Sequence, residues 1–151
     1  MRRLLVPVLL LALALPGCGD DDDGGAAAPP TKPKVEIPAG PAPATLKIDD
    51  ITVGSGAEAV DGKQLTMHYV GVLHKNGVQF DASWDRSEPF PFRLGVDSVI
   101  QGWHQGIKGM KVGGRRRLII PPDLAYGDTG QGDIGPNETL VFVVDLVAVT
   151  D

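Results

Sequence analysis

Most aromatic side chains of this chain fall in segments where a helix and a sheet would face each other, namely Tyr69, Phe80, Phe90, Phe92, Trp103, Tyr126 and Phe142. Ordinary core packing accounts well for Phe92. Trp103 is different, because an indole at the start of the only helix candidate is an unusual core filler for a small domain. An indole floor with two tyrosine hydroxyls nearby is what an apolar ligand pocket needs. The residue types therefore predict a pocket that binds an apolar ligand.

Nucleophilic and metal-dependent chemistry has little support in the sequence. There is no glycine-rich phosphate loop leading into a helix, and no paired-cysteine metal spacing. His68 and His74 could share one face of a strand, but a metal site would need a converging third ligand. A surface or boundary role is the better interpretation for these two histidines and for His104. We therefore expect no metal and no cofactor.

Alternating apolar residues predict the strands that would position the pocket. In residues 64–74, one face would carry Leu65, Met67, Tyr69, Gly71 and Leu73. Asn76-Gly77 predicts a type I′ hairpin turn, with residues 78–82 as the returning strand. Further strands are predicted at residues 46–53, 90–94, 115–120 and 140–149, and Pro121-Pro122 stops the strand at residues 115–120.

One helix is predicted over residues 98–110, with an apolar stripe of Val99, Trp103, Ile107 and Met110. Asp97 or Ser98 could cap its start. Residues 121–139 are rich in Gly, Pro, Asp and Asn, which predicts a long loop. A sheet of about five strands with one short helix packed on it belongs to the α+β class.

The first 18 residues predict an export signal. Arg2 and Arg3 precede an apolar run over residues 4–15, which is shorter than the ~20 residues that a membrane-spanning helix needs. The run ends in Leu15-Pro16-Gly17-Cys18, which resembles a bacterial lipobox, where the cysteine is lipidated. The alternative is an ordinary signal peptide that is cleaved elsewhere. We expect an exported lipoprotein held at a membrane of the cell envelope through Cys18.

Residues 19–45 predict a disordered tether, because Asp, Gly, Pro and Ala dominate them and bury little apolar surface. The net charge of −5 includes the four aspartates of residues 20–23, so the domain itself is only mildly acidic. Nucleic-acid binding would need a basic face. Arg115-Arg116-Arg117 alternate in a predicted strand, which favours a solvated sheet face over an anion site.

Short motifs follow one another in order through residues 46–151, the predicted folded domain. The first half contains His68-Tyr69-Val70-Gly71, Asn76-Gly77, Phe80-Asp81-Ala82-Ser83, Pro89-Phe90 and Phe92-Arg93-Leu94-Gly95. The second half contains Val99-Ile100-Gln101-Gly102-Trp103, Gly106-Ile107, Met110-Lys111-Val112-Gly113, Ile119-Ile120-Pro121-Pro122, Ala125-Tyr126-Gly127, Ile134-Gly135-Pro136-Asn137 and Thr139-Leu140-Val141-Phe142. This ordered set resembles the FKBP-type peptidyl-prolyl cis-trans isomerase family.

The resemblance implies an antiparallel half-barrel sheet wrapped around the short helix, with the pocket between them. It implies that Trp103 forms the pocket floor and that the walls include Phe80, Phe90, Val99, Ile134 and Phe142. The Ile100 backbone N–H and the Tyr126 hydroxyl would hold substrate carbonyls. Tyr69 and Arg86 would orient Asp81, although a simple surface pair between Asp81 and Arg86 is an equally good interpretation.

The resemblance also implies the function. We expect isomerisation of X-Pro bonds in proline-containing polypeptides of the cell envelope, by desolvation and twisting of the amide. The resemblance also implies binding of rapamycin-type macrocycles. We expect the protein to be a monomer. One alternative is an FKBP-like chaperone or peptide-binding module with little isomerase activity. Another is a surface lipoprotein with only an interaction role. Two features differ from the family pattern, Asp133 before Ile134 and a short loop over residues 127–134, and both concern the flap over the pocket.

Overall fold

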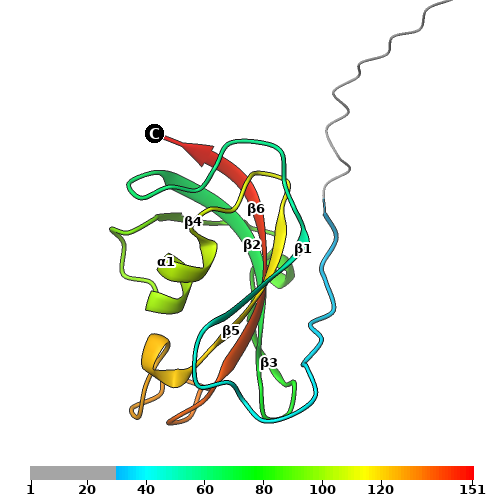
Figure 1. Ribbon diagram of the computed structural model, residues 1–151, viewed down its shortest axis with the longest axis vertical. Coiled ribbons are helices and arrows are strands. Elements are labelled where there is room, and N and C mark those ends of the chain that lie inside the picture. The colour runs from blue at the N-terminus through cyan, green and yellow to red at the C-terminus, as the bar shows by residue number, and fades with distance from the viewer. Residues whose placement is uncertain (1–29) are drawn as a thin grey trace, which may run out of the picture.

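The computed structural model describes residues 30–151 (Figure 1). The predicted signal, Cys18 and the first part of the predicted tether lie outside the described residues. The strands are β1 (Lys47–Thr52), β2 (Gln64–Leu73), β3 (Gln79–Ala82), β4 (Phe90–Arg93), β5 (Arg115–Ile120) and β6 (Leu140–Thr150). The helices are α1 (Gln101–Ile107) and two 3-10 turns, η1 (Ser83–Arg86) and η2 (Pro122–Leu124). No helix within residues 30–151 is long and apolar enough to cross a membrane.

The strands form one antiparallel sheet in the order β1-β5-β6-β2-β3, and β4 also pairs with β2. Because β6 occupies one edge of β2 along its length, β3 and β4 must share the other edge. Val70 is opposite Ala82 in β3, and Met67 is opposite Phe90 in β4. The sheet is therefore five strands wide although it contains six strands. The α+β class, the antiparallel pairing and the one α-helix within residues 30–151 confirm the prediction.

The main core lies between α1 and the face of the sheet that curves around it (Figure 1). Alternate residues of β2 supply this core, and Leu65 and Met67 are fully buried. The opposite face of the sheet is apolar as well. A second cluster there contains Val70, Val72, Ala82, Ile119 and Val141.

Residues 30–45 do not stand free of the domain as the composition predicted. Val35 and Ile37 pack against the second cluster, and the Arg115 side chain donates a hydrogen bond to the Thr31 carbonyl oxygen. These contacts form because the few apolar residues of this segment alternate with polar ones and pack on an apolar face of the sheet.

The turn between β2 and β3 also differs from the prediction. A type I′ turn needs positive φ at both central residues, but here Gly77 has φ 72° while Asn76 is not among the residues with positive φ. Leu73 instead donates its N–H to the Val78 carbonyl, which closes a four-residue loop. The Asn76 side-chain oxygen accepts the Val78 N–H, a local bond that stabilises this alternative turn.

The helix is shorter than predicted, since it begins at Gln101 and ends at Ile107. Neither Asp97 nor Ser98 caps it. The Asp97 carboxylate accepts the N–H of Arg93, so it closes the turn before the helix. Met110 lies beyond the helix but is still buried, which explains why the apolar stripe looked longer than the helix.

Candidate functional site

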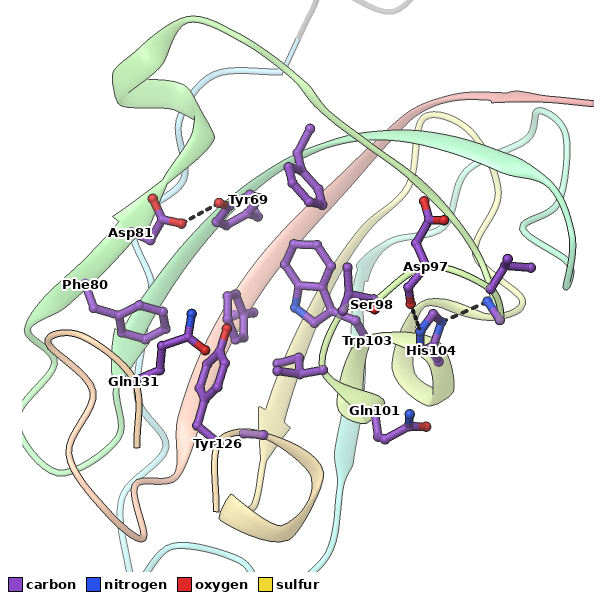
Figure 2. A pocket seen from close by; sticks show the side chains of 17 residues that line it. Tyr69, Phe80, Asp81, Asp97, Ser98, Gln101, Trp103, His104, Tyr126 and Gln131 are labelled. Carbon is purple, nitrogen blue, oxygen red and sulfur yellow. Dashed lines mark hydrogen bonds between the residues drawn. The ribbon is translucent and has the colours of Figure 1, made fainter. Parts of the chain in front are cut away.

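A cavity of about 880 Å³ opens between α1 and the sheet (Figure 2). Its walls come from β2, β3, β4, β6, α1, the loop between β4 and α1, and the loop that follows η2. The structure brings together here most residues that the sequence singled out, namely Tyr69, Phe80, Asp81, Phe90, Val99, Ile100, Trp103, Tyr126 and Phe142. Their individual roles toward a substrate stay predictions.

The aromatic rings of the cavity hold one another edge to face. The Trp103 ring centroid lies 5.0 Å from that of Tyr69 and 5.4 Å from that of Phe142, with steep interplanar angles in both pairs. Phe80 meets Phe142 in the same way at 5.5 Å. Such contacts orient rings beyond what area burial alone would do. The indole of Trp103 is 5% exposed, so it forms a rigid apolar floor.

Gly71 lets two of these rings come together over β2. A Cβ atom at this position would lie 2.6 Å from the Phe80 ring and 2.7 Å from the Phe142 ring, closer than carbon atoms approach. Because glycine has no side chain, Phe80 and Phe142 can close over the strand. The predicted strand pattern placed Gly71 on the same face as Tyr69, and the structure shows that a glycine at this position leaves room for the rings of Phe80 and Phe142.

Three polar side chains form a closed cluster at one side of the cavity. The Tyr69 hydroxyl donates to the Asp81 carboxylate at 2.5 Å (Figure 2). Arg86 donates to the same carboxylate at 2.5 Å and to the Tyr69 oxygen at 2.9 Å. Arg86 does not line the cavity itself, and it acts on the cavity only through these two partners.

The cluster sets the charge of its members. Partial burial tends to raise the pKa of Asp81, but the hydrogen bonds from Tyr69 and Arg86 and the Arg86 charge lower it below its ordinary value. Burial first, and then the bond to Asp81, raises the pKa of Tyr69 to about 12. The carboxylate therefore stays ionised and the phenol stays neutral over the ordinary pH range, so Asp81 is poorly suited to donate a proton.

Two further donors belong to the cavity wall. Ile100 precedes the first residue of α1, and its N–H donates to no other group within residues 30–151. Tyr126 follows η2, and its hydroxyl likewise has no hydrogen bond to the described part of the chain. Burial, with a smaller contribution from the Asp81 charge, raises the pKa of Tyr126. Both groups are therefore available to donate hydrogen bonds to a bound ligand.

The loop between β4 and α1 contributes a wall that sequence reasoning missed. Residues 95–98 line the cavity, and His104 fixes their course. Its Nδ1 accepts the Gly95 N–H at 2.8 Å, so its Nε2–H donates to the Asp97 carbonyl at 3.0 Å (Figure 2). No local pattern could have revealed this, because the contact forms only when the loop folds back over the helix.

Ile134 differs from the other predicted pocket residues. It is 8% exposed and packs in the main core, and it is not part of the cavity wall. Gln131 lines the cavity instead, and its N–H bonds to the Ile134 carbonyl. In the described part of the chain, no three His, Cys, Asp or Glu side chains come together in a way that could hold a metal ion.

Comparison with known proteins agrees with this geometry. Residues 56–147 match the family described as FKBP-type peptidyl-prolyl cis-trans isomerase. An FK506-binding protein of Streptomyces anulatus is 57% identical over 120 residues, covering 78% of this chain and 97% of the relative. A probable FK506-binding protein of Corynebacterium glutamicum is 52% identical over 117 residues, covering 78% of this chain and 98% of the relative.

Solved structures are similar as well. The structure of AtFKBP13 superposes with a TM-score of 0.65 at 44% identity, over 71% of this chain and 94% of the other. FkpA from Escherichia coli has the same TM-score and identity, over 70% of this chain and 48% of the other. Matched through most of its described length by sequence and by fold, this chain belongs to the FKBP-type peptidyl-prolyl cis-trans isomerase family.

Proposed function

We propose that the aromatic cavity performs the isomerisation by taking up a proline ring on the Trp103 indole and removing water from the amide that precedes it. The observation that supports this most directly is the closed set of ring contacts around Trp103. A rigid apolar floor of this kind suits a compact apolar ring. Members of the family are peptidyl-prolyl cis-trans isomerases, so the proposal concerns how this chain does it.

Rotation about an X-Pro bond is slow because the amide has partial double-bond character, with a barrier of about 18–20 kcal/mol. The planar ground state is dipolar and gains from hydration. The twisted transition state has lost that resonance, so desolvation disfavours it less. A site that removes water therefore binds the transition state better than the ground state. A thousandfold acceleration needs a difference of only about 4 kcal/mol.

The polar groups would orient the substrate within this apolar site. The Ile100 N–H and the Tyr126 hydroxyl lie on the cavity wall and have no hydrogen-bond acceptor within residues 30–151, and they would bind substrate carbonyls. Asp81 would act through its fixed negative charge near the twisting amide. Because no bond breaks in the substrate, the reaction needs no nucleophile and no proton transfer to the substrate.

The experiment compares apolar and polar substitutions in a protease-free assay of proline isomerisation in a peptide. Trp103→Ala or Phe142→Ala should reduce kcat/KM and macrocycle affinity together. Each can also destabilise the core by about 3–5 kcal/mol, so near-ultraviolet circular dichroism must show that the variant is folded. Asp81→Asn, which is almost isosteric, should lower the rate only moderately. Abolished activity in Asp81→Asn with full activity in Phe142→Ala would contradict the mechanism.

We propose in addition that the cavity binds macrocycles of the FK506 or rapamycin type. Two relatives that match nearly along their whole length carry FK506-binding in their names. Such a ligand should compete with the peptide substrate and should quench or shift the fluorescence of Trp103. A Trp103→Phe variant, which leaves Trp84 as the remaining tryptophan, is the control that assigns the signal. A macrocycle that binds without competing would place its site elsewhere.

We propose finally that the protein is exported and anchored through Cys18, so that its substrates are proteins of the cell envelope. The proposal rests on the paired arginines, the apolar run and the lipobox-like end of the first 18 residues. Two or more acyl chains give stable attachment, whereas one is marginal. Intact mass of the mature protein should show a diacylglyceryl group on Cys18, and Cys18→Ala should release or misprocess the protein. An unmodified N-terminus beyond Cys18 would refute the anchor.

A further inference from the structure

Residues 31–37, here called the strap, run along the face of the sheet opposite to α1 (Figure 1). Val35 and Ile37 are half-buried, while Lys34 and Glu36 between and beside them are exposed. This alternation is that of an extended chain with one face on a surface. The surface is the second apolar cluster, in which Val141 is fully buried and Val72 is 5% exposed.

Two arginines of β5 hold the backbone of the strap. The Arg115 guanidinium donates to the Thr31 carbonyl at 2.7 Å, and Arg117 donates to the Glu36 carbonyl at 3.3 Å. Arg116, between them, points to the other face and bonds the Gly106 carbonyl of α1. The three arginines alternate between the two faces of the sheet, as predicted. Arg115 and Arg117, however, bind the strap and do not face solvent alone.

The strap also contacts η1, the turn that follows β3. The Lys32 ammonium pairs with the Asp85 carboxylate at 2.6 Å, and Asp85 accepts a second bond from Gln79 at 2.7 Å. Trp84 packs against the same apolar cluster as Val35 and Ile37 and stacks on His68 at 4.1 Å. Two successive residues of η1 are therefore held from the outer side of the sheet.

The next residue of the same turn is Arg86, which reaches the cavity side. It bonds Asp81 and Tyr69 there, as described above. A second link joins η1 to Tyr69, because the buried Ser83 hydroxyl accepts the Tyr69 N–H at 2.8 Å. Because η1 has only four residues and Arg86 directly follows Asp85, we expect a displacement of the outer contacts to displace Arg86 as well.

We propose that the strap is a positioning element of the isomerase site, which holds η1 so that Arg86 remains bonded to Tyr69 and Asp81. The inference rests on the proposed contribution of the Asp81 cluster to isomerisation. Loss of the strap contacts should leave the aromatic floor in place and disturb the polar cluster alone. The strap residues are thus positioning residues, and none of them touches the substrate.

The test uses four variants of the full chain. The strap variant combines Lys32→Ala, Val35→Ser and Ile37→Ser, and its control combines Lys34→Ala with Glu36→Ala, whose side chains point outward. Lys32→Ala and Lys34→Ala form a second, charge-matched pair. We expect the strap variant to lower kcat/KM by about three- to tenfold, since small misplacements of a positioned group have effects of this order or larger. The outward control should keep wild-type activity.

A double-mutant cycle with Arg86→Ala separates positioning from general stability. If the strap acts through Arg86, its substitutions should give no further loss of kcat/KM once Arg86 is absent, because the two changes remove one interaction. An undiminished loss in the Arg86→Ala background would overturn the proposal. So would wild-type kcat/KM in a folded strap variant.

A spectroscopic measurement tests the strap independently of activity. Partial burial raises the pKa of Asp81, and the bonds from Tyr69 and Arg86 outweigh it. Loosening Arg86 should therefore raise the pKa of the Asp81 carboxyl, which a carbon-13 NMR titration of its side chain measures. An unchanged Asp81 titration in the strap variant would contradict the proposal even where activity falls. Failure of the proposed role of Asp81 would give a different result. Isomerisation would then be unchanged in Asp81→Asn and Arg86→Ala, while the pKa of Asp81 would still rise in the strap variant.

Discussion

Phe80 and Asp81 are consecutive residues of β3, and yet both side chains line the cavity. Neighbouring residues of a regular strand point to opposite faces. Here the pairing shifts from Gly71 opposite Asp81 to Val72 opposite Gln79, which leaves Phe80 as an extra residue without a partner. Bulges of this kind redirect side chains next to functional sites. One short strand thereby supplies both an apolar wall and the carboxylate of the polar cluster.

Gly71→Ala should damage the cavity from beneath. The added methyl group would push on the rings of Phe80 and Phe142. We expect a loss of about 1–3 kcal/mol in the free energy of unfolding, as for other overpacked sites. Because both rings are cavity walls, kcat/KM should fall by about tenfold or more. Urea unfolding and the isomerisation assay measure the two effects.

The matched control is Gly106→Ala. Its methyl group would meet the Leu118 side chain at 2.7 Å, so it overpacks the contact between α1 and β5, and its three nearest atoms all belong to Leu118 and to no ring of the cavity. Stability should fall by a similar amount with a smaller effect on kcat/KM. Equal losses of activity in the two variants would mean that overpacking acts through stability and not through the rings.

His104→Ala should loosen the loop over residues 95–98. The imidazole links the Gly95 N–H to the Asp97 carbonyl. Its removal leaves the Gly95 N–H without its partner, while the Asp97 carbonyl keeps the bond from the Val99 N–H. Amide hydrogen exchange at Gly95 should become faster. The value of kcat/KM should fall by a few fold, because residues 95–98 form one wall of the cavity and would be displaced. His74→Ala is a suitable comparison, because His74 lies outside the cavity wall. Unchanged exchange at Gly95 would show that the loop holds itself.

Tyrosine titration offers a direct check of the polar cluster. The chain has two tyrosines, and burial is the first cause that raises the pKa of each. Absorbance at 295 nm should therefore show no step at the ordinary tyrosine pKa of about 10, and Tyr69→Phe should remove a step at about 12. For Tyr69 the folded-state pKa lies above the unfolded one. Its contribution to stability is thus complete below pH ~10 and is lost as the pH rises toward 12.

The pH dependence of the rate should lack a bell shape. A bell-shaped profile reports a general acid and a general base. The pKa of Asp81 is lowered and the pKa values of both tyrosines are raised, so none of these groups changes its charge in the intermediate pH range. Measurement of kcat/KM from acid to mildly alkaline pH decides this. A bell-shaped profile would contradict the mechanism.

Much of the fold could be predicted from residues close together in the sequence. Strand β5 lies at the residues that its composition and Pro121-Pro122 indicated, and β6 extends one residue beyond its prediction. Alternation in β2 placed Tyr69 and Gly71 on the core face. Trp103 was singled out because a large indole at the start of the only predicted helix is an unusual core filler for a small domain, and it does line the cavity.

What the sequence by itself determined were the strands, the family and the aromatic residues of the cavity, because alternation and ordered motifs are local properties of the chain. Tertiary structure alone decided the bulge at Phe80, the early end of α1, the bond between Gly95 and His104, and the packing of Val35 and Ile37 on the far face of the sheet. Each of these depends on a surface or a hydrogen-bonding partner that another part of the chain supplies only after folding. A few apolar residues in a polar segment are too weak a pattern to predict where they bind, and the apolar outer face of the sheet decides it.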